Sequence, residues 1–143
     1  MTFLNRTSFG YGVYMSNIVE MAAGTFTLLS VLTIGFQIAL GLGAPWGRFT
    51  LGGKYPDVLP MKARLIPVFS TVVLAFFIAI VLTRAGLIRP DLLEPSRIAI
   101  WLPVTYMALG LGLNSVSKSK PERRLWVPVI LVMLVCTLIV ALV

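Results

Sequence analysis

The sequence contains no histidine and a single cysteine. Without histidine, the chain lacks the commonest metal ligand and the side chain that usually titrates near physiological pH. The one cysteine, Cys136, excludes a disulfide within the chain. Carboxylates are also few: Glu20, Asp57, Asp91, Glu94 and Glu122. Because neither a metal-ligand cluster nor a nucleophile–base pair can be assembled from these residues, we expect no metal, no cofactor and no enzymatic activity.

Charge of either sign is scarce, since 12% of the 143 residues are charged and 58% are hydrophobic, with a mean hydropathy of +0.96. Soluble domains are typically about 25% charged and about 45–50% apolar. The apolar residues here form runs about as long as a bilayer is thick. The sequence therefore predicts one integral membrane domain over residues 1–143. A net charge of +7 in such a protein indicates membrane orientation and anionic-lipid contact, so we expect no nucleic-acid partner.

Four apolar segments predict four transmembrane helices. They cover about residues 18–42, 65–87, 98–113 and 125–143. The third is the shortest, with Pro103 in its first turns and Ser96 as the expected N-cap. The segment before the first helix lacks a compact basic region, so we expect no signal-peptide cleavage. Aromatic residues lie at the expected membrane interfaces: Tyr11, Tyr14, Trp46, Trp101 and Trp126.

Basic residues are divided unevenly between the two sides of these helices. The connections are named loop one (residues 43–64), loop two (88–97) and loop three (114–124). Loops one and three carry Arg48, Lys54, Lys62, Arg64, Lys118, Lys120, Arg123 and Arg124. The N-terminus and the loop-two side carry Arg6, Arg84, Arg89 and Arg97. The positive-inside rule therefore predicts a multi-pass cell-membrane protein with loops one and three in the cytoplasm and both termini outside.

Two short motifs recur in the same order. ALGLG ends the first segment at residues 39–43 and the third at residues 108–112. PMKARLIPV opens the second segment, and PERRLWVPV opens the fourth. We therefore predict an all-α, four-helix membrane bundle built from two tandem hairpins, related by a pseudo-twofold axis along the membrane normal, with the ALGLG ends in close approach. The two repeat units cover about residues 18–87 and 98–143.

The stretch GAPWGRFTLGGKYPDVLP in loop one is rich in glycine and proline. It is not a Walker A loop, because an extra glycine precedes Lys54 and Tyr55 stands where a Ser or Thr is required. One interpretation is a small anion site in which the amides of Gly52 and Gly53 meet lipid headgroups; the other is a loop shaped only to lie on the membrane surface. The residues predicted to contact anionic headgroups are Arg48, Gly52, Gly53, Lys54, Arg64, Lys118, Lys120, Arg123 and Arg124.

One face of the first segment is polar. At about 100° per residue, six residues fall within roughly 140° of the helix circumference. Five of them are the candidate ligand-binding residues, namely Glu20, Thr27, Ser30, Thr33 and Gln37, and the sixth is Gly41. Hydrogen bonding between helices, worth about 0.6 kcal/mol per contact, is the commoner reason for such a face. The alternative is a ligand-binding or water-lined cleft, with Glu20 either functional or lying among headgroups.

Two groups of motifs, one in loop one and one at the start of the last segment, follow one another in a set order. Loop one contains PWG, GG and LP, at Pro45-Trp46-Gly47, Gly52-Gly53 and Leu59-Pro60. The last segment opens with S-x-x-E-R-x-x-W-x-P, at Ser119, Glu122, Arg123, Trp126 and Pro128. From about residue 40 onward, this order resembles that of small uncharacterised four-helix bacterial membrane proteins. The resemblance implies a bacterial inner membrane and no particular activity. The proline before Glu122 departs from the pattern, so the start of that helix is expected to differ.

Together these features predict a non-enzymatic membrane protein that binds a lipid, another amphipathic molecule or a membrane partner, as a homo-oligomer. The expected lipid is anionic because the predicted cytoplasmic loops are basic. The alternative is a small transporter or channel component in which Glu20 is the coupling acid.

Overall fold

The computed structural model describes the backbone of residues 3–143 and the side chains of residues 12–143. The side chains of Arg6 and Tyr11, used in the interpretation above, lie outside the described residues. Within this range the chain is helical and has no strand, which confirms the all-α prediction. The α-helices are α1 (Phe3–Leu42), α2 (Leu65–Arg84), α3 (Leu93–Ala99), α4 (Trp101–Ser115) and α5 (Lys120–Leu142). Three short 3-10 turns, η1 (Gly47–Phe49), η2 (Leu51–Gly53) and η3 (Pro90–Leu92), lie in the connections.

Three of these helices are long and apolar enough to cross a membrane: α1 in its stretch Gly12–Leu42, α2, and α5. The residues Pro90–Ala99 and Trp101–Ser115 pass the same test together and make a fourth crossing if the bent pair is one span. The helices extend beyond the apolar runs, since α1 already begins at Phe3 and α5 at Lys120. These lengths agree with a membrane protein.

The third apolar segment is broken near its start. The two parts are bent by 41° at Ile100. Pro103 explains the position of the break, because it has no N–H for the carbonyl of Ala99 and its ring collides with that carbonyl. Ser96 lies inside α3, where its hydroxyl donates to the Leu93 carbonyl at 2.6 Å, and the N-cap position belongs to Leu92. The prediction of Ser96 as an N-cap is therefore wrong.

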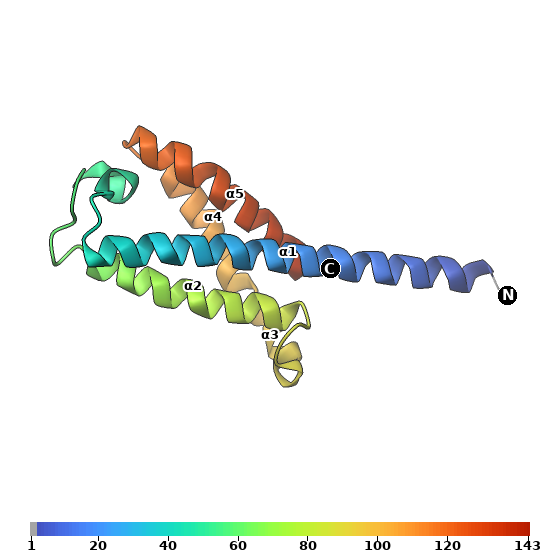
Figure 1. The fold of residues 1–143 in the computed structure, drawn as a ribbon. Helices are drawn as coiled ribbons and strands as arrows, with labels where there is room; N and C mark the ends of the chain where they lie inside the picture. Colours follow the sequence, from blue (N-terminus) through green and yellow to red (C-terminus); the bar gives the residue numbers. More distant parts are fainter. Residues whose placement is uncertain (1–2) are drawn as a thin grey trace.

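The long helices pack on one another at different angles. In Figure 1, α1 and α2 run alongside each other, while α5 is inclined to both of them. α1 packs against α2 and α5, and α4 packs against α5. Phe26, Phe77, Met107 and Met133 are among the buried residues that join α1, α2, α4 and α5 in one apolar core. α2 meets α4 at an edge-to-face contact between Phe77 and Tyr106, with ring centroids 5.1 Å apart.

The two occurrences of the recurring motifs differ in local structure. Gly43, the last residue of the first ALGLG, has a φ of +100° and ends α1, whereas the corresponding Gly112 lies inside α4. Pro67 is the third residue of α2, whereas the corresponding Pro128 lies inside α5. The second hairpin thus continues each helix further than the first hairpin does.

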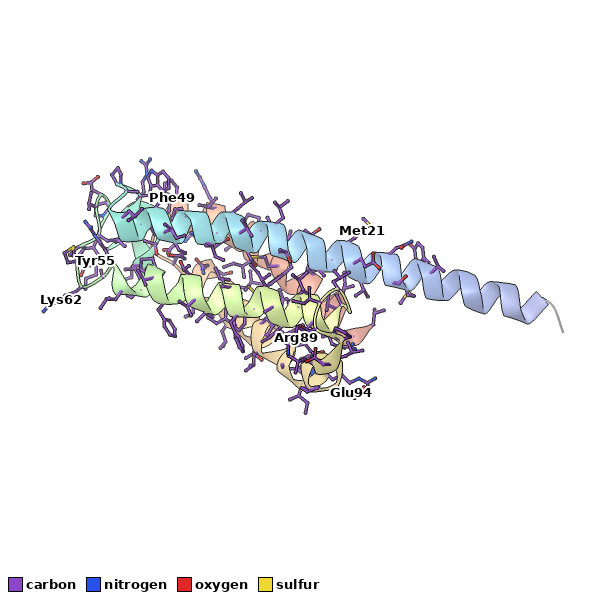
Figure 2. All side chains as sticks on the ribbon, turned by 60° about the horizontal axis from the view of Figure 1, so that its bottom comes forward. Met21, Phe49, Tyr55, Lys62, Arg89 and Glu94 are labelled. Carbon is purple, nitrogen blue, oxygen red and sulfur yellow. The ribbon has the colours of Figure 1, made fainter. Side chains whose placement is uncertain are left out.

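The molecule has two distinct ends. Loops one and three lie together at one end, named the basic end, and loop two lies at the other, named the loop-two end. Figure 2 shows Lys62 and Arg89 at these opposite ends. At about 1.5 Å per residue, the 40 residues of α1 measure about 60 Å and the 20 residues of α2 about 30 Å. The N-terminal part of α1 therefore continues past the other helices at the loop-two end (Figure 1).

Candidate functional site

Loop one is folded on itself. The amide of Gly47 donates to the Asp57 carbonyl at 2.8 Å, and the amide of Arg48 donates to the Pro56 carbonyl at 3.0 Å. These bonds bring the two arms of the loop so close that a Cβ on Gly47 would lie 1.7 Å from the Tyr55 carbonyl oxygen. Only glycine can occupy this position without moving the backbone.

Three hydrogen bonds attach loop one to the start of α5, and we name this set the clamp. The Gly52 amide donates to Glu122 Oε2 at 2.9 Å, the Ser119 hydroxyl donates to the Arg48 carbonyl at 2.5 Å, and Trp126 Nε1 donates to the Phe49 carbonyl at 2.7 Å. The glycine-rich motif and the S-x-x-E-R-x-x-W-x-P motif, far apart in the sequence, are therefore in direct contact.

Aromatic side chains reinforce the clamp. Phe36 of α1 stacks on Trp46 of loop one, with ring centroids 5.8 Å apart, and meets Trp126 of α5 edge to face at 5.0 Å. Such aromatic pairs contribute about 0.5–1.5 kcal/mol beyond the area they bury. Loop one is thus anchored to α1 as well as to α5.

Glu122 has an unusual position for a residue in the first turn of a helix. Ser119 is the N-cap of α5, and its hydroxyl accepts from the Glu122 amide at 3.3 Å. A glutamate three residues after the N-cap ordinarily turns back to the N-cap amide. Here its Oε2 accepts instead from the Gly52 amide and the Ser117 hydroxyl, and the residue is only 8% exposed. A carboxylate is therefore buried between loops one and three.

Beside Glu122 lies a cavity of about 450 Å³, named the main cavity. Its walls come from α1, α2, α4, α5 and loop one. The polar lining residues include Thr33, Gln37, Ser70, Tyr106, Asn114 and Glu122, and the apolar ones include Leu74, Met107, Ile130 and Met133. Leu109 and Leu113 of α4 also line it, yet they are 64% and 71% exposed. The main cavity is therefore open along α4.

The polar face predicted for the first segment is divided between several environments. Thr33 and Gln37 line the main cavity. Ser30 is fully buried, and its hydroxyl has no hydrogen-bond partner in the described part of the chain. Thr27 donates to the Ala23 carbonyl at 2.8 Å. The structure thus brings two of the five candidate residues to one cavity.

Glu20 lies elsewhere. It is exposed and lines a second cavity of about 370 Å³ at the loop-two end, together with Arg84. It precedes Gln37 by 17 positions on one continuous helix, which corresponds to about 25 Å. Glu20 and the main cavity are therefore separate features.

The cationic residues predicted to contact headgroups all lie at the basic end. The two salt bridges found among residues 12–143, Arg89–Asp91 and Arg97–Glu94, are both at the loop-two end. At the basic end, Arg64 donates to the Leu59 carbonyl and Arg123 to the Ser117 carbonyl. Arg48 and Lys54 lie over the rings of Phe49 and Tyr55. The Gly52 amide, predicted to meet a headgroup, donates to the protein's own carboxylate.

Several lining residues were not singled out as site residues from the sequence: Ser70, Tyr106, Asn114, Glu122 and Trp126. Glu122 and Trp126 did belong to a recognised motif, whose spacing was the available signal. No group of three or more His, Cys, Asp or Glu side chains within the described residues is arranged to hold a metal ion.

No protein-family model, curated protein sequence or solved structure matches this chain. The resemblance to small bacterial membrane proteins stays a prediction. The main cavity and the clamp are the features of the fold that bear on function.

Proposed function

We propose that this chain is a non-enzymatic, four-span protein of the bacterial inner membrane that binds one amphipathic molecule in the main cavity. The observation that carries the proposal is the order of residues along the cavity walls. On α5, Glu122 and Trp126 come first and are followed by Ile130 and Met133. This sequence of side chains extends over about 16 Å of helix, from a carboxylate to a thioether.

Two other walls have a similar order. On α4, Asn114 lies nearest the basic end, and Met107 lies two turns deeper. On α2, Ser70 is closer to the basic end than Leu74. A ligand with a polar head toward the basic end and an apolar tail toward the middle of the helices matches the α2, α4 and α5 walls, whereas α1 contributes two polar residues, Gln37 and Thr33.

The ligand is proposed to enter the main cavity from the bilayer, through the opening along α4. The exposed Leu109 and Leu113 border this opening on α4, and Ser70 and Leu74 line the facing wall on α2. Apolar residues around an opening at the depth of a hydrocarbon core favour a ligand already dissolved in lipid.

The proposed membrane architecture counts the bent α3–α4 pair as one span and treats the two hairpins as pseudo-twofold copies. In support, the middle glycine of each ALGLG packs against the next long helix of its own hairpin. A Cβ on Gly41 would be 3.4 Å from Val68, and a Cβ on Gly110 would be 3.8 Å from Ile130. Small residues at these positions let neighbouring helices approach closely in lipid.

The proposed orientation places the basic end in the cytoplasm, with both termini outside. The cations of loops one and three then face the anionic lipid of the cytoplasmic leaflet, each contributing about 1 kcal/mol near the surface. Assembly into a homo-oligomer remains part of the proposal.

Photolabelling in lipid nanodiscs tests the ligand proposal. A dodecyl alcohol bearing a diazirine is crosslinked by light, and the labelled residues are mapped by mass spectrometry with and without excess dodecanol. We expect labelling of main-cavity residues that dodecanol abolishes, because a specific site saturates whereas the lipid-facing surface does not. Ser70→Phe, which fills the cavity, removes the saturable labelling. Val72→Phe is the matched control, since Val72 is 63% exposed and does not line the cavity. Labelling that dodecanol does not reduce contradicts the proposal.

The alternative, a small transporter component with Glu20 as the coupling acid, has one supporting observation. Glu20 and Arg84 line the second cavity, and Arg84 Nε is buried without a hydrogen-bond partner among the described residues. The alternative expects pH-dependent flux in proteoliposomes that Glu20→Gln removes. Absence of flux in the unmodified protein excludes it.

A further inference from the structure

The carboxylate of Glu122 has one oxygen left for a ligand. Both of its hydrogen bonds within the described residues, from Gly52 and Ser117, go to Oε2. Oε1 accepts none of the hydrogen bonds found there. Glu122 is more than nine-tenths buried as a residue and borders the main cavity. Oε1 is not among the fully buried side-chain atoms that lack a partner, so it keeps some accessible surface and is free to accept from a bound head group.

Two of the other polar side chains around the cavity, Thr33 and Asn114, also present acceptors, because they donate to backbone carbonyls. Gln37, Ser70 and Tyr106 line the cavity as well and donate no hydrogen bond within the described residues. Thr33 Oγ1 donates to the Leu29 carbonyl at 2.8 Å. Asn114 Nδ2 donates to the Gly110 carbonyl at 2.8 Å, which leaves Oδ1 available. Trp126 Nε1 is occupied by the Phe49 carbonyl, while its ring still lines the cavity. The lining therefore combines hydrogen-bond acceptors, one negative charge and an aromatic ring.

We propose that the head group bound in the main cavity is a protonated amine, so that the ligand is an amphipathic ammonium compound. This inference rests on the proposed function and specifies its ligand. An ammonium group has three donors and no acceptor, which complements the free Glu122 and Asn114 oxygens. Trp126 adds a ring face that attracts cations. An anionic head placed against Glu122 is repelled by the like charge of its carboxylate.

The cations of the basic end sharpen this selectivity. They lie at the same end of the molecule as Glu122, and their field slows the approach of inorganic cations from solution. An amphipathic amine reaches the main cavity through the opening along α4, from within the lipid. The carboxylate therefore selects a cation that has first partitioned into the membrane.

Competition measurements test the charge of the head group. The diazirine-bearing dodecyl alcohol is displaced from the main cavity in nanodiscs by dodecylamine, dodecanol or dodecanoate. We expect dodecylamine to compete roughly tenfold or more better than dodecanol, because hydrogen bonds between charged partners are the stronger ones, and dodecanoate to compete worst. In Glu122→Gln we expect the ratio of amine to alcohol to fall by about tenfold, while dodecanol itself competes as before.

Glu122→Gln keeps a carbonyl oxygen that accepts from Gly52 and Ser117, so the clamp remains while the charge is lost. Glu94→Gln makes the same change of net charge at the loop-two end and is expected to leave the ratio unchanged. An amine-to-alcohol ratio that is the same in the unmodified protein and in Glu122→Gln overturns the ammonium proposal but leaves the amphipathic-ligand proposal intact. If no labelling is saturable in the unmodified protein, both proposals are wrong.

Discussion

The two ends of the molecule hold their connections in different ways. At the basic end, the clamp joins residues 70, 71 and 77 positions apart, through two backbone carbonyls, one amide and a buried carboxylate. At the loop-two end, Arg89 pairs with Asp91 at 2.7 Å and Arg97 pairs with Glu94 at 3.6 Å, both within three positions. The first end is connected through tertiary structure, and the second through local, exposed ion pairs.

The difference follows from the distribution of charge. The basic end has eight cationic residues and two acidic ones, whereas the described residues of the loop-two end have three of each. Cations in such excess have too few carboxylates to pair with. The basic end is instead held by hydrogen bonds to the backbone, which are insensitive to salt compared with surface ion pairs. Its positive charge stays available for contacts outside the protein.

The largest expected difference between the ends is in their accessibility from outside the cell. In a Cys136→Ala background, Met61→Cys places a thiol at the basic end and Leu92→Cys places one at the loop-two end, neither of which changes the charge. A membrane-impermeant maleimide applied to intact bacterial cells is expected to label Leu92→Cys at once and Met61→Cys only after permeabilisation. The opposite labelling pattern shows that the basic end lies outside the cell and not in the cytoplasm. Equal labelling of both variants contradicts the proposed membrane topology.

Glycine substitutions compare the ends by stability. Gly47→Ala places a Cβ against the Tyr55 carbonyl and is expected to lower the free energy of unfolding by about 3 kcal/mol. Gly86→Ala is the matched change at the loop-two end, where φ is +75° but no atom lies within 4 Å of the added Cβ. It is expected to lose about 1 kcal/mol. Thermal unfolding in detergent and trypsin cleavage in loop one measure the effect. If Gly47→Ala and Gly86→Ala lower the free energy of unfolding equally, the basic end is not the more constrained of the two ends.

Tryptophan substitutions isolate one hydrogen bond of the clamp. Trp126→Phe removes the donor to the Phe49 carbonyl while keeping an aromatic ring, with an expected loss of about 1 kcal/mol. Trp101, 46% exposed at the loop-two end, has no hydrogen bond from its indole nitrogen among the described residues, so Trp101→Phe should change stability by less than about 0.5 kcal/mol. Denaturant titrations of both variants compare the two ends directly. If Trp101→Phe loses more free energy of unfolding than Trp126→Phe, the hydrogen bond from Trp126 does not stabilise the protein as proposed.

The smallest effect is expected from acid at the loop-two end. Hydrogen bonds from the Arg89 guanidinium, together with its charge, hold the pKa of the Asp91 carboxyl below its ordinary value of 3.8. Because the Asp91 pKa is lower in the folded protein than in the unfolded chain, the stabilisation is fully present at a pH above the unfolded-state pKa. It is lost as the pH falls through the folded-state pKa. An NMR titration of Asp91 is expected to show the lowered pKa, which rises toward 3.8 in Arg89→Gln and in high salt. If neither Arg89→Gln nor high salt changes the Asp91 pKa, the Arg89–Asp91 ion pair does not form in solution.

Helix boundaries set by local chemistry could be predicted from the sequence. The first segment ends at Leu42 and the second starts at Leu65, as predicted, because glycine and proline punctuate the chain between them. Helical periodicity also placed Thr33 and Gln37 on one polar face of the first segment. The bend at Ile100 was signalled by Pro103, although its effect on the start of the helix was misjudged at Ser96.

The main cavity could not be predicted in full. Ser70, Tyr106 and Asn114 are single polar residues on different helices, and only tertiary packing brings them beside Gln37. Glu122 was part of a recognised motif, but a glutamate at that spacing ordinarily caps its own helix. Its turn toward Gly52 depends on a loop 70 positions earlier, which no local pattern encodes.

The clamp has a consequence for the biosynthesis of the protein. Ribosomes add about 5–20 residues per second, so loop one is made on the order of ten seconds before the residues that will hold it. In the proposed topology, α1 and α2 enter the membrane during that interval, while loop one lacks its partners and the inner face of the pair lacks α5. The clamp cannot close until Ser119, Glu122 and Trp126 have left the ribosome. A chain truncated before Lys120 is therefore expected to remain a substrate for membrane quality control, however well its first two helices insert.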